Sequence, residues 1–180
     1  MEAVDRISAE AYLEGENRAD QRHEFVNGRV YAMVGASKRH NAICLNLASR
    51  LREATRGGPC QVWMVDVKVH IRTAGDERFY YPDLVVSCEP AEESAFYTET
   101  PRLVVEVLSE STERADREEK FFAYRNLPTL EEYVLVAQET PRVEVYRRAE
   151  DWRPLYFGPG ETAPFESLAT EVSVDAIYAE

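Results

Sequence analysis

The chain has 180 residues, of which 44% are hydrophobic and 30% are charged, and its formal net charge at pH 7 is −12. A chain of this size and composition can bury one sizeable core, so these values exclude an intrinsically disordered chain and we expect a single domain over 1–180. The acidic balance also excludes a broad basic surface for nucleic acid, so any such contact must depend on a local basic patch or on bound cations.

The N-terminal part of the chain predicts two helices separated by a hairpin. Ser8 is placed to cap a short helix over 9–14. Asn27-Gly28 stands between two apolar runs and is the strongest short signal for a β-hairpin, because both residues tolerate positive φ. Ser37 caps a longer helix, whose apolar residues recur at helical spacing until Gly57-Gly58-Pro59 ends it.

The period then changes to two, which is typical of β-strands. From Cys60 the alternation predicts one long strand over 60–72, on which Asp66, Lys68 and His70 form a solvated face. A turn at 74–77 leads into a second strand that ends at 87, and the two strands form an antiparallel hairpin. An apolar run at 103–108 predicts the third strand.

The remainder of the chain predicts a helix followed by strands. The helix covers 113–126 and Pro128 closes it. Two strands joined by a short turn lie within 131–148, and the less regular tail ends in a short helix around 175–178. This order of elements indicates an α/β or α+β fold with a mixed central sheet.

The cysteines and the apolar runs bear on the compartment. Cys44, Cys60 and Cys88 are widely spaced, which is typical of neither a disulfide framework nor a zinc site, so we expect them to be small buried residues. The sequence has neither an apolar segment of signal-peptide type at its start nor a run of about 20 apolar residues elsewhere. These features predict a cytoplasmic protein without membrane contact.

The stretch "RLVVEVLSES" places Glu106 in the middle of a strand that should be buried. A buried carboxylate without partners costs at least several kcal/mol, so the side chain must be compensated or protonated. Asp83 lies on the preceding strand, directly after Pro82, which interrupts strand pairing. Two carboxylates on neighbouring strands are a suitable ligand pair for Mg²⁺, which can activate water for phosphodiester cleavage.

Lys120 stands at the margin of the apolar face of the following helix, from where its ammonium can extend toward the sheet. Lys68 is an alternative to Lys120 as the lysine that acts beside these carboxylates, because its strand is close to the hairpin of Asp83. Other interpretations remain open. Asp83 could bond its own backbone in a turn, Glu106 could pair with a buried arginine, and Lys120 could be solvated. His23 and His40 are isolated histidines without ligand spacing.

Three segments together resemble the Uma family of restriction-endonuclease-like proteins, which belongs to the PD-(D/E)XK nuclease superfamily. They read "YYPDLVVSC", "LVVEVLSESTERADREEKFFAYRNLPTLEEYVLV" and "RVEVYRR". Further similarity in "RHEFVNGRVYAMVGASKRHNAICLNLASRL" and "FESLATEVSVDAIY" extends the resemblance over nearly the whole chain. The resemblance implies a restriction-endonuclease-like αβββαβ core with helices flanking a mixed sheet.

The resemblance also assigns roles to residues. Asp83 matches the aspartate of the PD element and Glu106 the first position of the E-x-K element, which implies that both are metal ligands and catalytic residues. Leu108 stands where the superfamily has lysine, and the resemblance moves that lysine to Lys120 on the next helix. Glu24, in "RHEFVNG", resembles the N-terminal acidic residue that many members add to the catalytic site.

The leading hypothesis is a Mg²⁺ or Mn²⁺ dependent endonuclease that hydrolyses DNA, with Lys38, Arg39 and Arg72 flanking the cleft to bind the backbone. By analogy, a homodimer would suit cleavage of both strands. The alternative is a catalytically silent nuclease-like module that binds a protein or a nucleic acid. A metal-dependent phosphoesterase for small nucleotides is a third hypothesis.

Overall fold

The structure is a computed structural model, which describes residues 6–89 and 94–179. The helical elements are α1 (Ala9–Glu16), α2 (Lys38–Ala54), α3 (Glu113–Ala115), the π-helical turn η1 (Asp116–Lys120), α4 (Phe121–Tyr124), the 3₁₀ turns η2 (Arg148–Glu150) and η3 (Glu166–Leu168), and α5 (Val174–Ile177). The strands are β1 (His23–Val26), β2 (Arg29–Ala32), β3 (Gln61–Met64), β4 (Lys68–Thr73), β5 (Asp76–Tyr80), β6 (Leu84–Ser87), β7 (Tyr97–Thr98), β8 (Pro101–Leu108), β9 (Glu132–Ala137), β10 (Val143–Arg147), β11 (Pro154–Phe157), β12 (Thr162–Phe165) and β13 (Thr170–Ser173).

The strands form two larger sheets and one additional pair. A six-stranded sheet has the order β11-β10-β9-β8-β6-β3, a five-stranded sheet has the order β2-β1-β5-β4-β7, and β12 pairs with β13. In the six-stranded sheet β8 and β9 run parallel, and the other neighbouring strands run antiparallel. The predicted mixed α/β architecture is therefore confirmed.

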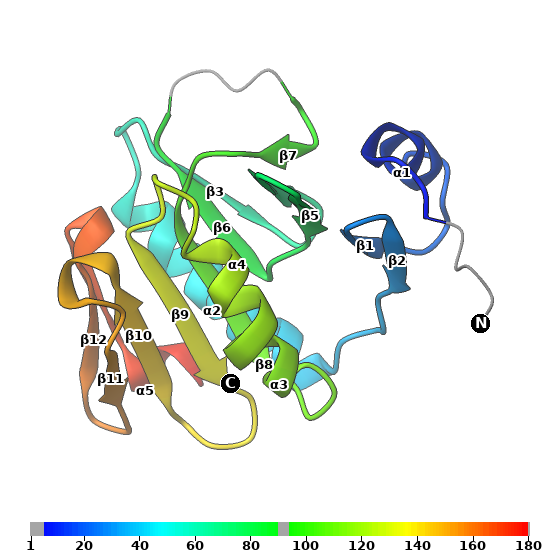
Figure 1. Cartoon of the computed structure of the whole chain (residues 1–180). Coiled ribbons are helices and arrows are strands. Elements are labelled where there is room, and N and C mark those ends of the chain that lie inside the picture. The colour runs from blue at the N-terminus through cyan, green and yellow to red at the C-terminus, as the bar shows by residue number, and fades with distance from the viewer. Residues whose placement is uncertain (1–5, 90–93, 180) are drawn as a thin grey trace.

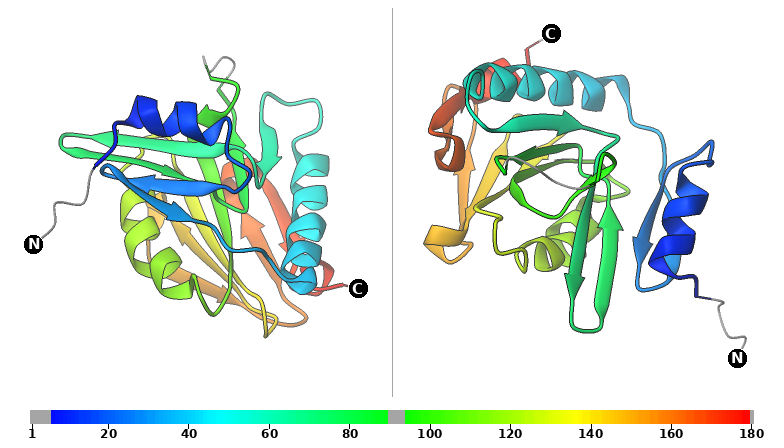
Figure 2. Two further views of the ribbon diagram at one scale, coloured as in Figure 1. Left: turned by 90° about the vertical axis from the view of Figure 1, so that its right-hand side faces the viewer. Right: turned by 90° about the horizontal axis from the view of Figure 1, so that it is seen from above.

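Alternation along β8 gives the six-stranded sheet two covered faces. Val105 and Val107 pack in one core with Leu47 of α2, whereas Val104 and Leu108 pack in a second core with Tyr124 of α4. Figure 1 and Figure 2 show α2 on one face of this sheet and the α3–η1–α4 segment on the other. Each of these side chains contributes about 1.5–3 kcal/mol by its burial, so both helical layers are held firmly on the sheet.

The early helices and the first hairpin form where the sequence predicts them. The Ser8 hydroxyl accepts from the backbone N–H of Ala11, and the Ser37 hydroxyl accepts from that of His40, so both helices have the expected N-caps. Asn27 and Gly28 both adopt positive φ at the turn between β1 and β2. In Figure 2 α1 lies over the strands of the five-stranded sheet, where Tyr12 is buried with aromatic residues of β1 and β5.

The prediction of one long strand over 60–72 is wrong. This strand and the one that follows it form a hairpin, and each of the two is interrupted at a position opposite the interruption in the other. Val65 adopts φ of 61° between β3 and β4, and Pro82 lies between β5 and β6. The N–H of Val65 donates to the carbonyl of Asp83 at 3.3 Å, so the two breaks lie side by side. One end of the hairpin belongs to the six-stranded sheet and the other to the five-stranded sheet, and Asp83 stands at the junction.

The predicted solvated face of this strand is also wrong for two of its three residues. Lys68 and His70 are buried, whereas Asp66 is exposed. The ring of His70 stacks on Phe79 at a centroid distance of 4.1 Å, and its nitrogens contact carboxylates of Glu77 and Glu99. Burial is possible because aromatic and acidic partners from β5 and the β7 region cover this face, which the alternation of a single strand does not reveal.

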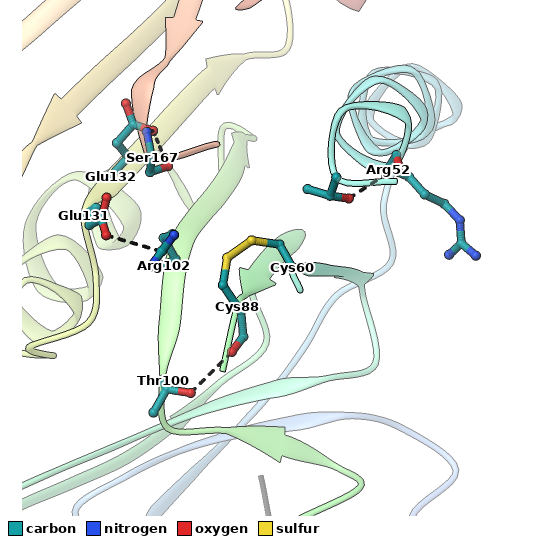
Figure 3. Close-up of a disulfide and its surroundings, with 10 residues drawn as sticks. Arg52, Cys60, Cys88, Thr100, Arg102, Glu131, Glu132 and Ser167 are labelled. Carbon is teal, nitrogen blue, oxygen red and sulfur yellow. Dashed lines mark hydrogen bonds and ion pairs between the residues drawn. A yellow bond between two sulfur atoms is a disulfide. The ribbon is translucent and has the colours of Figure 1, made fainter. Parts of the chain in front are cut away.

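The expectation for the cysteines is wrong in two cases. Cys60 and Cys88 form a disulfide with a Cα–Cα distance of 3.8 Å (Figure 3). Cys44 is a free buried cysteine. The register explains the pair, because Gln61 of β3 lies opposite Ser87 of β6 and the two cysteines are the next residues along each strand. Cysteine spacing alone does not give that register.

The C-terminal segment is more regular than predicted. It contains β11, the β12–β13 pair and a final helix, α5, that begins one residue before the predicted position. Glu132 of β9 holds this segment, because its carboxylate accepts from the backbone N–H of Ser167 at 3.0 Å and from the guanidinium of Arg147 at 2.9 Å (Figure 3). Among the described residues, none of the helices is both long enough and apolar enough to cross a membrane.

Candidate functional site

A pocket of about 1110 Å³ opens at the junction between the two larger sheets. Its walls come from the N-terminal turns of α2, the break between β5 and β6, the carboxyl end of β8 and η1. Asp83, Glu106, Asp116, Lys120 and His40 all line it. Elements distant in sequence therefore direct their ionisable groups into one volume.

Asp83 and Glu106 lie next to each other across paired strands. Leu84 of β6 pairs with Val105 of β8, and the antiparallel register continued by one position sets Asp83 opposite Glu106. Glu106 is 3% exposed, whereas the side chain of Asp83 is 21% exposed toward the pocket. Oδ2 of Asp83 accepts from the N–H of Val107 at 2.7 Å, which fixes its orientation.

Lys120 is the centre of a buried charge cluster. Its Nζ lies 3.0 Å from Oε1 of Glu24, 3.2 Å from Oδ1 of Asp116 and 3.4 Å from Oε1 of Glu106. Asp116 and Lys120 occupy the two ends of η1, and π-helical turns of this kind are frequent at functional sites. Lys120 is only 8% exposed, so its ammonium depends on these carboxylates for solvation.

Glu24 reaches the cluster from the five-stranded sheet. It lies on β1, and its Oε1 also accepts from the backbone N–H of Tyr81 at 3.2 Å, next to the break at Pro82. The cluster thus joins the two sheets, with Glu24 from one and Glu106 from the other. Lys120 contacts both Glu24 and Glu106, and Asp83 lies opposite Glu106 in the register of β6 and β8.

The electrostatics of the cluster favour additional positive charge. Burial raises the pKa of Glu106 well above its usual value of 4.5, Lys120 opposes the shift, and the charges of Asp116, Asp83 and Glu24 add to it. Burial also raises the pKa of Asp116, again opposed by Lys120. For Lys120, burial lowers the pKa, but the carboxylates of Glu106, Glu24 and Asp116 raise it well above 10.5. The single ammonium of Lys120 therefore contacts three carboxyl groups, and Asp83 adds a fourth negative charge to the cluster.

Asp116 belongs to the cluster although sequence reasoning did not select it. Its Oδ1 is buried, lacks a geometric hydrogen-bond partner among the described residues, and lies 3.2 Å from Nζ of Lys120 in an ion pair. Its position four residues before Lys120 on the same helical segment is the signal that could have identified it.

His40 and Cys44 were also missed, and the interpretation of His40 as an isolated histidine is wrong. Nε2 of His40 lies 3.2 Å from Oδ2 of Asp83, and its Nδ1 lies 3.5 Å from Sγ of Cys44. Burial lowers the pKa of His40, but the hydrogen bond and charge of Asp83 outweigh it and raise that pKa above 6.5. The spacing of four residues on a predicted helix could have revealed the pair.

The other basic candidates lie at different places. The ammonium of Lys68 donates to the hydroxyl of Tyr81 at 3.2 Å, and His23 pairs with Glu16. Lys38 begins α2 at the rim of the pocket, beside Ser37. Arg39 donates to the carbonyl of Gln138, also at this rim, at 2.6 Å. Arg72 lines a separate surface pocket near Gly75, so the expectation that it flanks the cleft is wrong.

Comparisons with known proteins agree with this architecture. A mixed sheet flanked by helices is the architecture of the restriction-endonuclease-like class of α/β proteins. The chain belongs to the Uma2 family, whose model is described as "Putative restriction endonuclease" and matches residues 9–176. The predicted family membership is confirmed.

Relatives and a solved structure extend the comparison. The protein slr1290 of Synechocystis sp. is 34% identical over 176 residues, which cover 96% of this chain and 92% of that protein. The protein sll1609 of the same organism is 33% identical over 148 residues, which cover 81% of this chain and 82% of that protein. A crystal structure from Anabaena variabilis, described as "a putative nuclease belonging to DUF820", superposes with a TM-score of 0.75 at 16% identity. That superposition covers 89% of this chain and 91% of the other, and it confirms the restriction-endonuclease-like fold.

Proposed function

We propose that the protein is a nuclease that hydrolyses phosphodiester bonds of DNA with the help of Mg²⁺ or Mn²⁺. The single observation that carries the proposal is the meeting of Asp83, Glu106 and Lys120 in one pocket of a restriction-endonuclease-like fold. The family description and the description of the solved relative support a nuclease. The kind of cation, the substrate and the role of each residue belong to the proposal.

The residues of the pocket fit a hard divalent cation. Mg²⁺ takes oxygen ligands and usually one or two carboxylates, and the pocket offers the paired carboxylates of Asp83 and Glu106. Asp116 adds a buried oxygen without a hydrogen bond, and Lys120 alone does not neutralise the cluster. When bound, the cation would lower the pKa of a coordinated water and offset charge on the phosphate.

The side chains of this chain have distinct tasks in the proposed reaction. Asp83, held by the N–H of Val107, and Glu106 hold the cation. Lys120 orients the attacking water and offsets negative charge that develops on the phosphate oxygens. Glu24 fixes the ammonium of Lys120 through its contact at 3.0 Å, and it acts as an outer carboxylate. The contacts of Lys120 with Glu24 and Glu106 support these proposed tasks.

The position of Lys120 can explain why a leucine, Leu108, stands where the superfamily has lysine. Leu108 packs in the core with Tyr124 and Val104, so this strand position is used for packing. Lys120 enters from η1 and brings its ammonium to 3.4 Å from Glu106. We infer that the helical lysine performs the task that the superfamily usually gives to the strand lysine.

A cleavage assay with matched variants tests the proposal. Supercoiled plasmid is incubated with wild type, Asp83→Asn and Glu106→Gln in Mg²⁺, Mn²⁺ or EDTA. We expect wild type to convert the plasmid to nicked and linear forms with metal only, and both variants to lose about 10²–10³-fold in rate, as removal of a key transition-state group does. A mononucleotide ester is assayed in parallel.

Each contrary outcome has a distinct meaning. Cleavage in EDTA, or undiminished cleavage by Glu106→Gln, would contradict the assignment of the ligand pair. Hydrolysis of the small ester alone would indicate the phosphoesterase hypothesis. If calorimetry with Mn²⁺ shows equal binding or no binding for wild type and Asp83→Asn, the catalytically silent module is the better description.

A further inference from the structure

A second group of ligand atoms lies beside the carboxylate cluster. One ring nitrogen of His40, Sγ of Cys44 and one carboxylate oxygen of Asp83 all lie within 4.8 Å of one another. His40 and Cys44 are separated by one turn of α2 and therefore share a helix face, while Asp83 comes from the break before β6. All three line the same pocket, so a cation and its water can reach them.

The chemistry of this group differs from that of the Glu106 side. It combines an imidazole nitrogen, a thiolate sulfur and a carboxylate oxygen, whereas Glu106, Asp116 and Glu24 offer only oxygen. Mg²⁺ has little affinity for sulfur and nitrogen ligands, whereas Zn²⁺ and its neighbours in the transition series bind them well. A site with three protein ligands and a fourth position open to water is the usual arrangement of an accessible zinc site.

The protein holds these ligands nearly in place. Cys44 is 2% exposed within the core under α2, so its side chain has little freedom to turn away. Nε2 of His40 already faces Oδ2 of Asp83, and Nδ1 faces Sγ of Cys44, at 3.2 and 3.5 Å. Asp83 is oriented from the opposite side by the N–H of Val107. Such outer support is typical of metal ligands.

We propose that His40, Cys44 and Asp83 bind a zinc-type transition-metal cation at a site that is chemically distinct from the carboxylate cluster around Glu106. Binding replaces the thiol proton of Cys44 by the metal, and this proton is released to solvent. The site goes beyond the proposed function, because binding of the cation at His40 and Cys44 does not require phosphodiester cleavage.

Shared use of Asp83 has a regulatory consequence, which rests on the proposed function. Asp83 belongs to both ligand sets and its single negative charge is shared when both cations are bound, so Zn²⁺ held by His40 and Cys44 weakens the binding of Mg²⁺ with Glu106, and Mg²⁺ weakens that of Zn²⁺ equally. Zinc therefore raises the Mg²⁺ concentration that cleavage requires, and excess Mg²⁺ weakens the apparent affinity for zinc.

Cobalt substitution tests the site directly. Co²⁺ is added to the protein under anaerobic conditions without reductant, and the sulfur-to-cobalt charge-transfer absorption in the near ultraviolet is recorded. Cys44 is the free cysteine of the chain while Cys60 and Cys88 are joined, so a sulfur band must come from Cys44. We expect the band in wild type and its displacement by added Zn²⁺.

Matched variants identify the ligands. Cys44→Ser should abolish the band. If circular dichroism shows that this variant does not fold, Cys44→Ala is used in its place and should also lack the band. His40→Ala should weaken zinc binding by more than about tenfold, since loss of outer support alone costs about 10–100-fold. The Cys60→Ser/Cys88→Ser double variant is the control and should keep the band.

The outcomes separate this site from the proposed nuclease. Glu106→Gln should lose cleavage and keep the cobalt band, whereas Cys44→Ser should lose the band and keep Mg²⁺-dependent cleavage. Absence of a sulfur band in wild type, its persistence in Cys44→Ser, its loss in the double variant, or unchanged zinc affinity in His40→Ala each overturns the zinc site. None of these four results depends on whether the protein cleaves DNA.

Discussion

Nζ of Lys120 lies 3.4 Å from Oε1 of Glu106, and the two residues are buried together where η1 crosses the end of β8. The contact explains how a carboxylate can occupy the middle of an apolar strand, because the ammonium offsets part of its cost. It also joins folding to the proposed chemistry, since the same two groups stabilise each other and would act on the phosphate.

Replacement of Lys120 should affect both stability and cleavage. In Lys120→Met the carboxylates of Glu106, Glu24 and Asp116 lose their shared cation, so we expect a loss of about 3–5 kcal/mol in the free energy of unfolding at neutral pH without metal. Cleavage should fall by about 10²–10⁴-fold, the usual contribution of a group that positions or transfers a proton. Urea titration and single-turnover plasmid cleavage measure the two effects.

Lys68→Met is the matched control, because Lys68 is also buried but donates to Tyr81. Its cleavage rate should stay within about tenfold of wild type, well below the effect expected for a proton-transfer group. The opposite pattern, with Lys68→Met inactive and Lys120→Met active, would show that the lysine has been assigned to the wrong element.

The metal-free protein should become less stable as the pH rises above the ordinary range of carboxyl groups. The pKa values of Glu106 and Asp116 are raised in the folded state, chiefly by burial. Between the usual value of 4.5 and the raised pKa of Glu106 the folded state binds more protons than the unfolded state, so stability is complete below that window and is lost through it. For each extra proton bound by the folded state, the free energy of unfolding falls by about 1.4 kcal/mol per pH unit.

Urea unfolding in EDTA at a series of pH values measures this slope. Glu106→Gln should flatten it, because glutamine does not titrate. Added Mg²⁺ should reverse the trend by binding the ionised form. A wild-type stability that rises with pH across this window in EDTA would show that Glu106 is already ionised in the folded protein.

Reduction of the disulfide should destabilise the protein. Cys60 and Cys88 close a loop with a sequence separation of 28, and the chain-entropy model assigns such a link about 2–4 kcal/mol. Thermal or urea unfolding with and without dithiothreitol should show this difference in wild type and in Cys44→Ser alike. An effect of reductant that persists in the Cys60→Ser/Cys88→Ser variant would have another origin.

The buried pair of Arg147 and Glu132 should hold the C-terminal segment on the sheet. Arg147 is 3% exposed and also donates to the carbonyl of Pro164, while Glu132 binds the N–H groups of Glu166 and Ser167. Arg147→Met leaves Glu132 buried without its cation, so we expect a loss of about 3–5 kcal/mol.

Arg142→Met is the control for this pair. Arg142 pairs with Glu144 but its side chain is 49% exposed, so its loss should cost less than about 1 kcal/mol. Urea unfolding compares the two variants, and equal effects would mean that the charge of Arg147 is not needed for docking.

Local patterns in the sequence predicted the elements that depend on neighbours in the chain. Ser8 and Ser37 cap their helices through backbone groups three residues away, and Asn27-Gly28 sets its turn by its own dihedral preference. The apolar run around Glu106 marks a strand by composition alone. Each of these signals acts over a few residues, so one sequence suffices to read it.

Features that depend on register or on packing between elements were missed. Alternation from 60 to 72 hides the break at Val65, because the break follows from each arm joining two different sheets. The pairing of Cys60 with Cys88 requires the register of β3 and β6. His40 looks isolated along the chain, and only the position of α2 over the end of β6 brings it to Asp83.

The sequence by itself determined which residue types are available, that Glu106 would need compensation in an apolar strand, and where the capped helices and the first hairpin begin. Only the tertiary structure decided which charges meet, including Asp116 and His40, and that Lys120 rather than Lys68 contacts Glu106. The physical reason is that propensity and burial act locally, whereas ion pairs and ligand sets form between side chains that distant segments bring within about 4 Å of each other.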